Sequence, residues 1–185
     1  MRASRDEKDR SHLRIIASAS RLFRERGMDG ASVGDVMQDA GLTHGGFYKH
    51  FESKDALVES AIAAAFDDLL HRFGTDHIQE AFCRFQTQYL SEEHRSNPGL
   101  GCPVAALGQE VGRGSESLKV AFGTGVKRII SAIVARMTGS TSAKRKAAIR
   151  EFSMLVGAIV IARASDDATA REVLSACRKN VRNIH

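Results

Sequence analysis

The chain of 185 residues contains only two prolines, Pro98 and Pro103, and no tryptophan. Proline is the strongest helix breaker, so its scarcity leaves long stretches in which helices can form without interruption. No stretch alternates apolar and polar residues with the two-residue period of a strand, whereas helical periodicity recurs along most of the chain. We therefore predict an all-α protein of about nine helices.

Cysteine and long apolar runs are also scarce. The three cysteines form no CxxC pair, which argues against a disulfide framework and favours a reducing compartment. The longest apolar run covers nine residues, Met154 to Ala162, and is too short to span a bilayer. The first 26 residues hold eight basic side chains and no apolar core of a signal peptide. We expect a cytoplasmic protein.

The net charge of +5 is not concentrated at one end of the chain. Residues 1–60 hold ten basic and ten acidic side chains, so bulk charge does not identify a DNA-binding region. Residues 1–26 carry a local excess, with eight basic and four acidic side chains. This segment is either a solvated, frayed end or an arm that follows the minor groove or phosphates through Arg2, Arg5, Lys8 and Arg10.

Catalytic signatures are missing as well. The sequence has no HExxH, GxSxG or Walker A motif. His44 and His50 lie six residues apart, about 240° around a helix, so they cannot hold a metal from one helix face. We predict that the protein is not an enzyme and that it needs no cofactor or metal.

The informative segment is 32–51, which contains two short, capped helical stretches. Ser32 occupies a capping-box position with Asp35 three residues later, and Gly41 ends the first stretch. Thr43 is expected to cap a second helix over 44–50, and Ser53 to cap a long helix that follows. Two capped helices joined by a tight turn predict a helix-turn-helix, whose second helix enters the DNA major groove. The alternative is a plain helical hairpin in a bundle.

The start of the second helix has the composition of a DNA-contacting tip. Gly45 and Gly46 cost a helix about 0.8–1 kcal/mol each relative to alanine, a loss that close approach to DNA would explain. The free backbone N–H groups near Thr43 and His44 favour a phosphate, and side chains there can reach base edges. Tyr48 and Lys54 offer a hydroxyl and an ammonium to the DNA backbone.

Residues 10–70 resemble the N-terminal domain of the TetR family of transcriptional regulators. The resemblance is carried by Ala19, Leu22, Phe23, Gly27, Ser32, Ala40–Thr43, Gly46–Phe51 and Ser53–Leu57. It covers about a third of the chain, and it implies a homodimer with two recognition helices. It also implies a second helical domain that binds a small effector, which usually releases the protein from its operator.

The resemblance implies roles for individual residues. Phosphate contacts would come from Ser32, Tyr48, His50 and Lys54. Contacts at or near base edges would come from His44, Gly45, Gly46 and Lys49, and the place of Thr43 at the start of the helix lets its side chain reach a base edge as well. Many members of the family have polar or basic side chains where this chain has Val33 and Gly34, which puts base reading by the first helix of the motif in doubt.

We divide the chain into a DNA-binding domain over 1–52, a long connecting helix over 53–72, and an effector-binding and dimerisation domain over 73–185. The helix predicted over 143–164 is apolar almost all round, so both of its sides must be covered. A second subunit would cover one side together with the helix over 167–182, which predicts a four-helix dimer interface. Burial in a monomer core is the alternative. The expected interface residues are Phe152, Leu155, Val156, Ile159, Val160, Val173, Cys177 and Val181.

The effector domain offers a set of apolar residues for a pocket, and we expect a modestly sized, apolar effector. The candidates are Phe82, Phe85, Tyr89, Cys102, Leu118, Phe122, Val126 and Ile129. Cys102 precedes Pro103 at a predicted helix N-terminus, where the helix dipole can lower the pKa of a thiol. It is either a sensor of oxidants or electrophiles, or a buried small residue.

Taken together, these features predict a transcriptional regulator that binds a palindromic operator in double-stranded DNA. We expect a repressor that a small molecule releases. The alternatives are a helical small-molecule-binding protein whose DNA contacts have degenerated, and a thiol-responsive regulator that uses Cys102.

Overall fold

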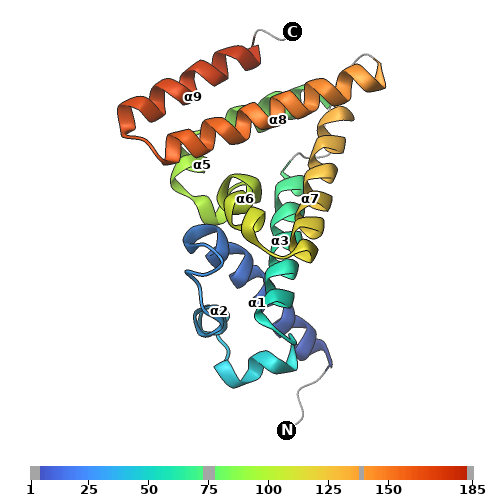
Figure 1. The fold of residues 1–185 in the computed structure, drawn as a ribbon, viewed down its shortest axis with the longest axis vertical. Helices are drawn as coiled ribbons and strands as arrows, with labels where there is room; N and C mark the ends of the chain where they lie inside the picture. Colours follow the sequence, from blue (N-terminus) through green and yellow to red (C-terminus); the bar gives the residue numbers. More distant parts are fainter. Residues whose placement is uncertain (1–4, 73–77, 138–139, 183–185) are drawn as a thin grey trace.

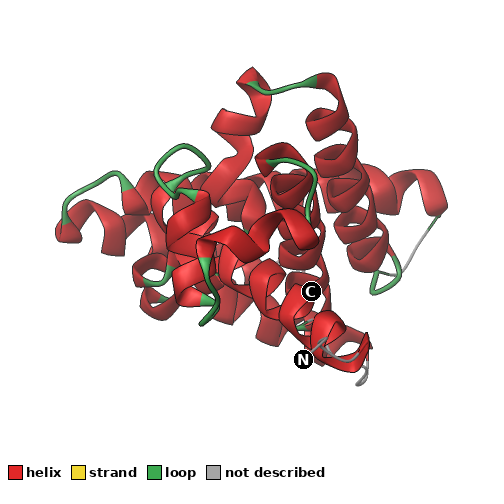
Figure 2. Cartoon of the chain, turned by 90° about the horizontal axis from the view of Figure 1, so that it is seen from below, coloured by secondary structure: helices red, strands yellow, loops and turns green. Residues whose placement is uncertain are grey.

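A computed structural model describes residues 5–72, 78–137 and 140–182. All the regular structure of these residues is helical, as Figure 2 shows, and the predicted all-α class is confirmed. The α-helices are α1 (Arg5–Arg26), α2 (Val33–Asp39), α3 (Lys54–His71), α4 (Ile78–Tyr89), α5 (Glu92–Ser96), α6 (Pro103–Arg113), α7 (Glu116–Val134), α8 (Thr141–Arg163) and α9 (Asp167–Arg182). Two 3-10 helices complete the list, η1 (His44–Lys49) and η2 (Pro98–Leu100).

Local sequence signals fix most helix ends where they were expected. Ser32 and Asp35 form the complete capping box at the start of α2. Ser53 accepts a hydrogen bond from the backbone of Ala56 at the start of α3. Gly27 and Gly41 follow α1 and α2 with φ of 83° and 68°, a conformation that is strained for residues with a Cβ.

Two expectations about the second helix of the motif were wrong. It is a 3-10 helix, η1, because two consecutive glycines do not support a longer α-helical run. Thr43 precedes it in extended conformation, but its side chain makes no capping hydrogen bond. Farther along the chain, α4 ends at Tyr89, and Ser91 caps the separate helix α5.

The N-terminal segment differs from one of the two interpretations offered for it. α1 begins at Arg5, so Arg5, Lys8 and Arg10 lie on a regular helix rather than on a frayed end, and contact of this segment with DNA stays a prediction. Arg2 lies outside the described residues. The basic side chains of this segment are therefore held at the end of α1.

The helices form an elongated molecule (Figure 1). α1, α2 and η1 lie at one end, which we call the head, and α8 and α9 lie at the opposite end. α3 runs from the head along α7. Gly125 allows this close packing, because a Cβ at that position would lie 2.2 Å from the ring of Phe66 in α3. None of the described helices has the length and apolarity needed to cross a membrane.

Two polar links connect the head to the rest of the protein. The buried Arg24 of α1 donates from Nη1 to the carbonyl of Gly101, at 2.9 Å, and its Nη2 lies 3.5 Å from the Asp68 carboxylate in α3. The backbone N–H of Met28, just after α1, donates to Glu110 Oε2 of α6 at 2.6 Å. The head therefore cannot change its orientation without affecting the segment between α5 and α6.

The predicted dimer residues divide by burial. Phe152, Leu155 and Ile159 are buried in the protomer's own core, which corrects their assignment to a surface, because α8 packs on α9, α7 and α6 of the same chain. Val160 is exposed, and Val156, Val173 and Cys177 are half-buried. The side chain of Val181 lies outside the described residues. Two apolar residues of α8 that the sequence did not single out, Ile149 and Ile161, are 42% and 50% exposed.

Candidate nucleic-acid interface

The two helical pieces of the motif are held on α1 by polar contacts as well as by the core. The Ser18 hydroxyl donates to the carbonyl of Val36 at 3.2 Å and also to the Asp39 carboxylate. Arg21 binds the same carboxylate from its other side. These hydrogen bonds, with Ser18 the largest contributor, lower the pKa of Asp39, so the link stays charged at neutral pH. α2 is thereby fixed relative to α1.

η1 is anchored by one aromatic side chain and exposes the rest. Phe47 is 1% exposed and packs against Phe51. Next to it Tyr48 is 75% exposed, so its ring and hydroxyl project into solvent. His44, Gly45 and Lys49 are exposed as well. A large exposed tyrosine beside a buried phenylalanine is the arrangement expected of a rigid recognition tip.

The three glycines near the tip have different surroundings. A Cβ at Gly45 would meet no heavy atom within 4 Å. A Cβ at Gly46 would lie 3.6 Å from Met37 Cε, which is ordinary contact. A Cβ at Gly34 would lie 3.6 Å from Nδ1 of His44, so the start of α2 and the start of η1 are neighbours. The fold itself does not require glycine at position 45.

The side chains predicted to contact phosphates differ in how available they are for such a contact. The Ser32 hydroxyl already donates to Asp35 Oδ2 and accepts from its backbone N–H, so a phosphate would have to replace the carboxylate. Burial, followed by the charge of His12, lowers the pKa of His50, so its ring is neutral at pH 7. Lys54 Nζ lies 6.0 Å from the centre of the Phe23 ring, beside a hollow between α3 and the end of α6. Lys54 must turn outward to reach DNA.

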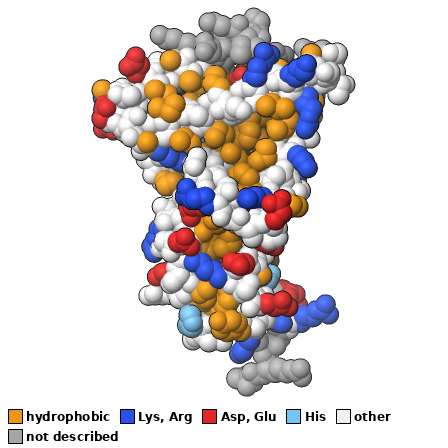
Figure 3. Space-filling view, viewed as in Figure 1, with side chains coloured by type: hydrophobic (Ala, Val, Ile, Leu, Met, Phe, Trp, Pro, Cys, Tyr) orange, Lys and Arg blue, Asp and Glu red, His pale blue; other side chains and the backbone are white. Residues whose placement is uncertain are grey.

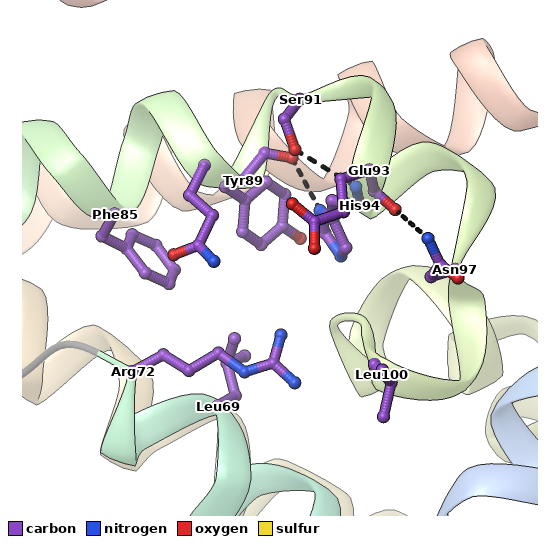
Figure 4. Close-up of a pocket in the computed structure, with 10 residues that line it drawn as sticks. Leu69, Arg72, Phe85, Tyr89, Ser91, Glu93, His94, Asn97 and Leu100 are labelled. Carbon is purple, nitrogen blue, oxygen red and sulfur yellow. Dashed lines mark hydrogen bonds between the residues drawn. The ribbon is translucent and has the colours of Figure 1, made fainter.

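The predicted effector residues are only partly brought together. Phe85 and Tyr89 line a cavity of about 250 Å³ between α3, α4, α5 and η2 (Figure 4). Phe82 is buried in the core, and Phe122 packs edge-to-face on Phe66. Val126 is also packed against the core, and Leu118 and Ile129 are buried in it. The periodicity of the helices identified these residues as inward-facing, but it could not separate a cavity wall from solid packing.

Sequence reasoning missed the polar wall of this cavity. It comes from the end of α3, the last turn of α4 and the segment after α4, and it includes Arg72, Gln88, Ser91, Glu93 and Asn97. His94 and the apolar Leu69 and Leu100 complete the lining. The sequence signal nearest to this wall is the turn-forming segment 97–101, whose proline and glycines indicate a loop but not a cavity.

The structure contradicts the interpretation of Cys102 as a reactive thiol. Cys102 is the N-cap residue of α6, as predicted, but it is fully buried. Burial raises the pKa of this thiol, which outweighs the hydrogen bonds at the helix start that lower it. Sensor cysteines are accessible and have low pKa values, so Cys102 fits the alternative of a buried small residue.

Comparisons with known proteins agree with this geometry. Residues 15–61 match the family model of bacterial regulatory proteins, tetR family. The HTH-type transcriptional repressor KstR2 of Rhodococcus jostii is 34% identical over 59 residues, which cover 32% of this chain and 29% of that protein. The HTH-type transcriptional regulator Rv0196 of Mycobacterium tuberculosis is 25% identical over 188 residues, 92% of each chain.

Solved structures extend the similarity to the whole fold. The reduced form of NemR from E. coli has a TM-score of 0.78 at 20% identity, covering 94% of this chain and 96% of that one. A TetR transcriptional regulator from Legionella pneumophila has a TM-score of 0.77 at 18% identity, covering 99% and 98%. The helical domain beyond the motif therefore has the same architecture as in these proteins.

Proposed function

The chain belongs to the TetR family of transcriptional regulators, and from this premise we propose that it is a homodimeric repressor that a small molecule releases from a palindromic operator. Residues 1–52 form the DNA-binding head, 53–72 the connecting helix and 73–185 the effector-binding and dimerisation domain. Its place of action is the cytoplasm, where the operator DNA is.

One observation carries the DNA-binding proposal. η1 exposes His44, Gly45, Tyr48 and Lys49 together at the extremity of the head, on a base fixed by Phe47 and by the Ser18–Asp39 link. A hairpin that served only as packing would have no reason to leave Tyr48 75% exposed there. A rigid tip with a hydroxyl, an imidazole and an ammonium suits the edges and phosphates of a major groove.

The dimer proposal rests on the free face of α8. Ile149, Val160 and Ile161 are each more than 40% exposed, although they are large and apolar. Figure 3 shows apolar side chains gathered on this side of the molecule, over the half that holds α8. A second copy would cover this face with its own α8, together with α9 of both chains, and would hold the two heads at a fixed spacing.

Selection from a random double-stranded DNA pool tests the function without knowledge of the target. The proposal predicts enrichment of a palindrome whose half-sites lie about 34–36 Å, one helical turn, or a multiple of it apart. Recovery of a single half-site, or of no common sequence, would contradict the proposed dimeric readout.

A further inference from the structure

The cavity between α3, α4, α5 and η2 is small and open on one side. Its volume of about 250 Å³ lies below the 300–1,000 Å³ that is typical of sites for drug-sized ligands. Phe85 and Leu69 supply an apolar wall, while Arg72, Gln88 and Glu93 supply charged and polar groups. This combination suits a compact ligand with one apolar part and one polar group.

Two hydrogen-bond donors of the lining differ in burial, since Arg72 is exposed and Tyr89 is buried. The Arg72 side chain extends from the end of α3 along the side of the cavity opposite Tyr89 and His94 (Figure 4), and it makes no ion pair or hydrogen bond with any described residue. Tyr89 is 3% exposed, and its hydroxyl has no oxygen or nitrogen partner within the described part of the chain. The Cys102 thiol lies beside this hydroxyl and is only a weak acceptor.

His94 does not supply the missing acceptor, because both of its ring nitrogens are occupied. Nδ1 lies 2.6 Å from the carbonyl of Tyr89, and Nε2 accepts from the backbone N–H of Cys102 at 2.9 Å. Burial lowers the pKa of His94 to about 4, and the charges of Arg163 and Arg72 act in the same direction. Arg163 and Arg72 thus both place positive charge near the His94 ring. Among the described residues of the lining, Glu93 on the α5 wall is the one carboxylate.

The cavity also adjoins the link to the head. Asn97 and Leu100 of the lining belong to the segment that forms η2, and η2 packs directly on α1. The residue after Leu100 is Gly101, whose carbonyl accepts the hydrogen bond from Arg24. A ligand that displaces η2 would therefore act on α1 at a contact the structure already contains.

We propose that this cavity binds a compact carboxylic acid, with its carboxylate on the Arg72 guanidinium and its ring or short chain on Phe85 and Leu69. The ligand shifts η2 and thereby α1, and this consequence rests on the proposed function of the protein. A guanidinium matches the planar geometry of a carboxylate with two parallel hydrogen bonds. A carboxylate also supplies acceptor oxygens to the Arg72 guanidinium, which has no ion pair with any described residue.

Calorimetric titration of the full chain with matched probes tests the site without DNA. Benzoate and cyclohexanecarboxylate carry the proposed group, and benzyl alcohol and benzylamine replace it with a neutral or a cationic one. We expect at least one carboxylate to bind with a Kd below about 10 mM and about tenfold more tightly than either replacement. Arg72→Gln should weaken its binding at least about tenfold, whereas Glu93→Gln should strengthen it, because a repulsive charge is removed.

Arg113→Gln is the matched control, since Arg113 is an exposed arginine at the end of α6, outside this cavity. It should bind the carboxylates as the unmodified protein does. The proposal is overturned if neither carboxylate binds, if benzyl alcohol or benzylamine binds equally well, or if Arg72→Gln has no effect. A weaker affinity in Glu93→Gln would also overturn it, because it would indicate a cationic or zwitterionic ligand.

A second titration links the site to DNA. With the operator from the selection experiment, the bound carboxylate should lower DNA affinity for the unmodified protein and for Arg113→Gln, but not for Arg72→Gln. If the protein binds an operator and no carboxylate, only the inference about the cavity fails. If it binds a carboxylate and no operator, the proposed function fails while the site remains.

Discussion

Gly45 offers a test that separates the needs of the fold from the needs of DNA binding. Within the described part of the chain, only Gly27 and Gly41 have positive φ, so the backbone at position 45 accepts any residue. A Cβ there would also meet no protein atom within 4 Å. Gly45→Ala should therefore fold normally. Since the fold does not require glycine at this position, we attribute it to the close approach of DNA.

Gly45→Ala should raise the stability of the protein and lower its affinity for the operator. Alanine restricts the unfolded chain and is the better helix former, so stability should rise by about 0.5–1 kcal/mol. For a chain of this length, that corresponds to an increase of about 1–4 °C in Tm. An added methyl group in a tightly packed contact costs about 1–3 kcal/mol. Operator affinity should therefore fall at least about fivefold, with both heads of a dimer affected.

Gly112→Ala provides the matched control. Gly112 is also exposed, a Cβ there would also meet nothing within 4 Å, and it lies in α6, outside the recognition tip η1. Thermal unfolding should show a similar gain for both variants, while fluorescence anisotropy on the operator should show a loss for Gly45→Ala alone. Equal operator affinity for the two variants would refute the idea that DNA approaches the backbone at Gly45.

Three further predictions concern readout, assembly and pH. His44→Ala should change which sequences are selected, whereas Lys54→Ala should weaken binding to all sequences alike; a loss of affinity without altered selectivity in both variants would contradict this division. Ile161→Glu should give a monomer in sedimentation at micromolar concentration, while Val120→Glu, at a position 61% exposed on α7, should remain a dimer; a dimeric Ile161→Glu variant would move the interface elsewhere. Because burial lowers the pKa of His94 to about 4, against an ordinary value of about 6.5, the folded state holds the neutral ring. Its contribution to stability is complete above pH 6.5 and is lost as the pH falls toward 4, a loss on the order of 2–3 kcal/mol in urea unfolding. His94→Gln should flatten this dependence, and an unchanged slope would assign it to other groups.

The head could be predicted closely because its signals are local. The capping box of Ser32, the cap at Ser53 and the positive φ at Gly27 and Gly41 depend on neighbouring residues only. The 3-10 form of η1 was missed, because capping patterns mark where a helix starts without stating its hydrogen-bond period. His44, Gly45, Tyr48 and Lys49 are exposed on it, and their contact with DNA stays a prediction.

The effector domain was harder to predict because its features depend on packing between distant segments. Phe152, Leu155 and Ile159 look like surface candidates on a helix that is apolar all round, yet they are buried in the protomer. Arg72 and Glu93 form the walls of one cavity although 20 residues separate them in the chain. Likewise, the position of Cys102 at a helix N-terminus suggested reactivity, but burial determines the pKa of its thiol.

The central claim is that two exposed tips read a palindromic operator as a pair, and operator affinity as a function of salt tests it most directly. Fluorescence anisotropy would be measured between 50 and 200 mM salt, on the selected operator and on a scrambled duplex of equal length. The account predicts a log–log slope on the order of −6 to −10 for the dimer, and at least about 10³-fold tighter binding to the operator. An affinity that does not change with salt, or equal binding to both duplexes, would contradict it.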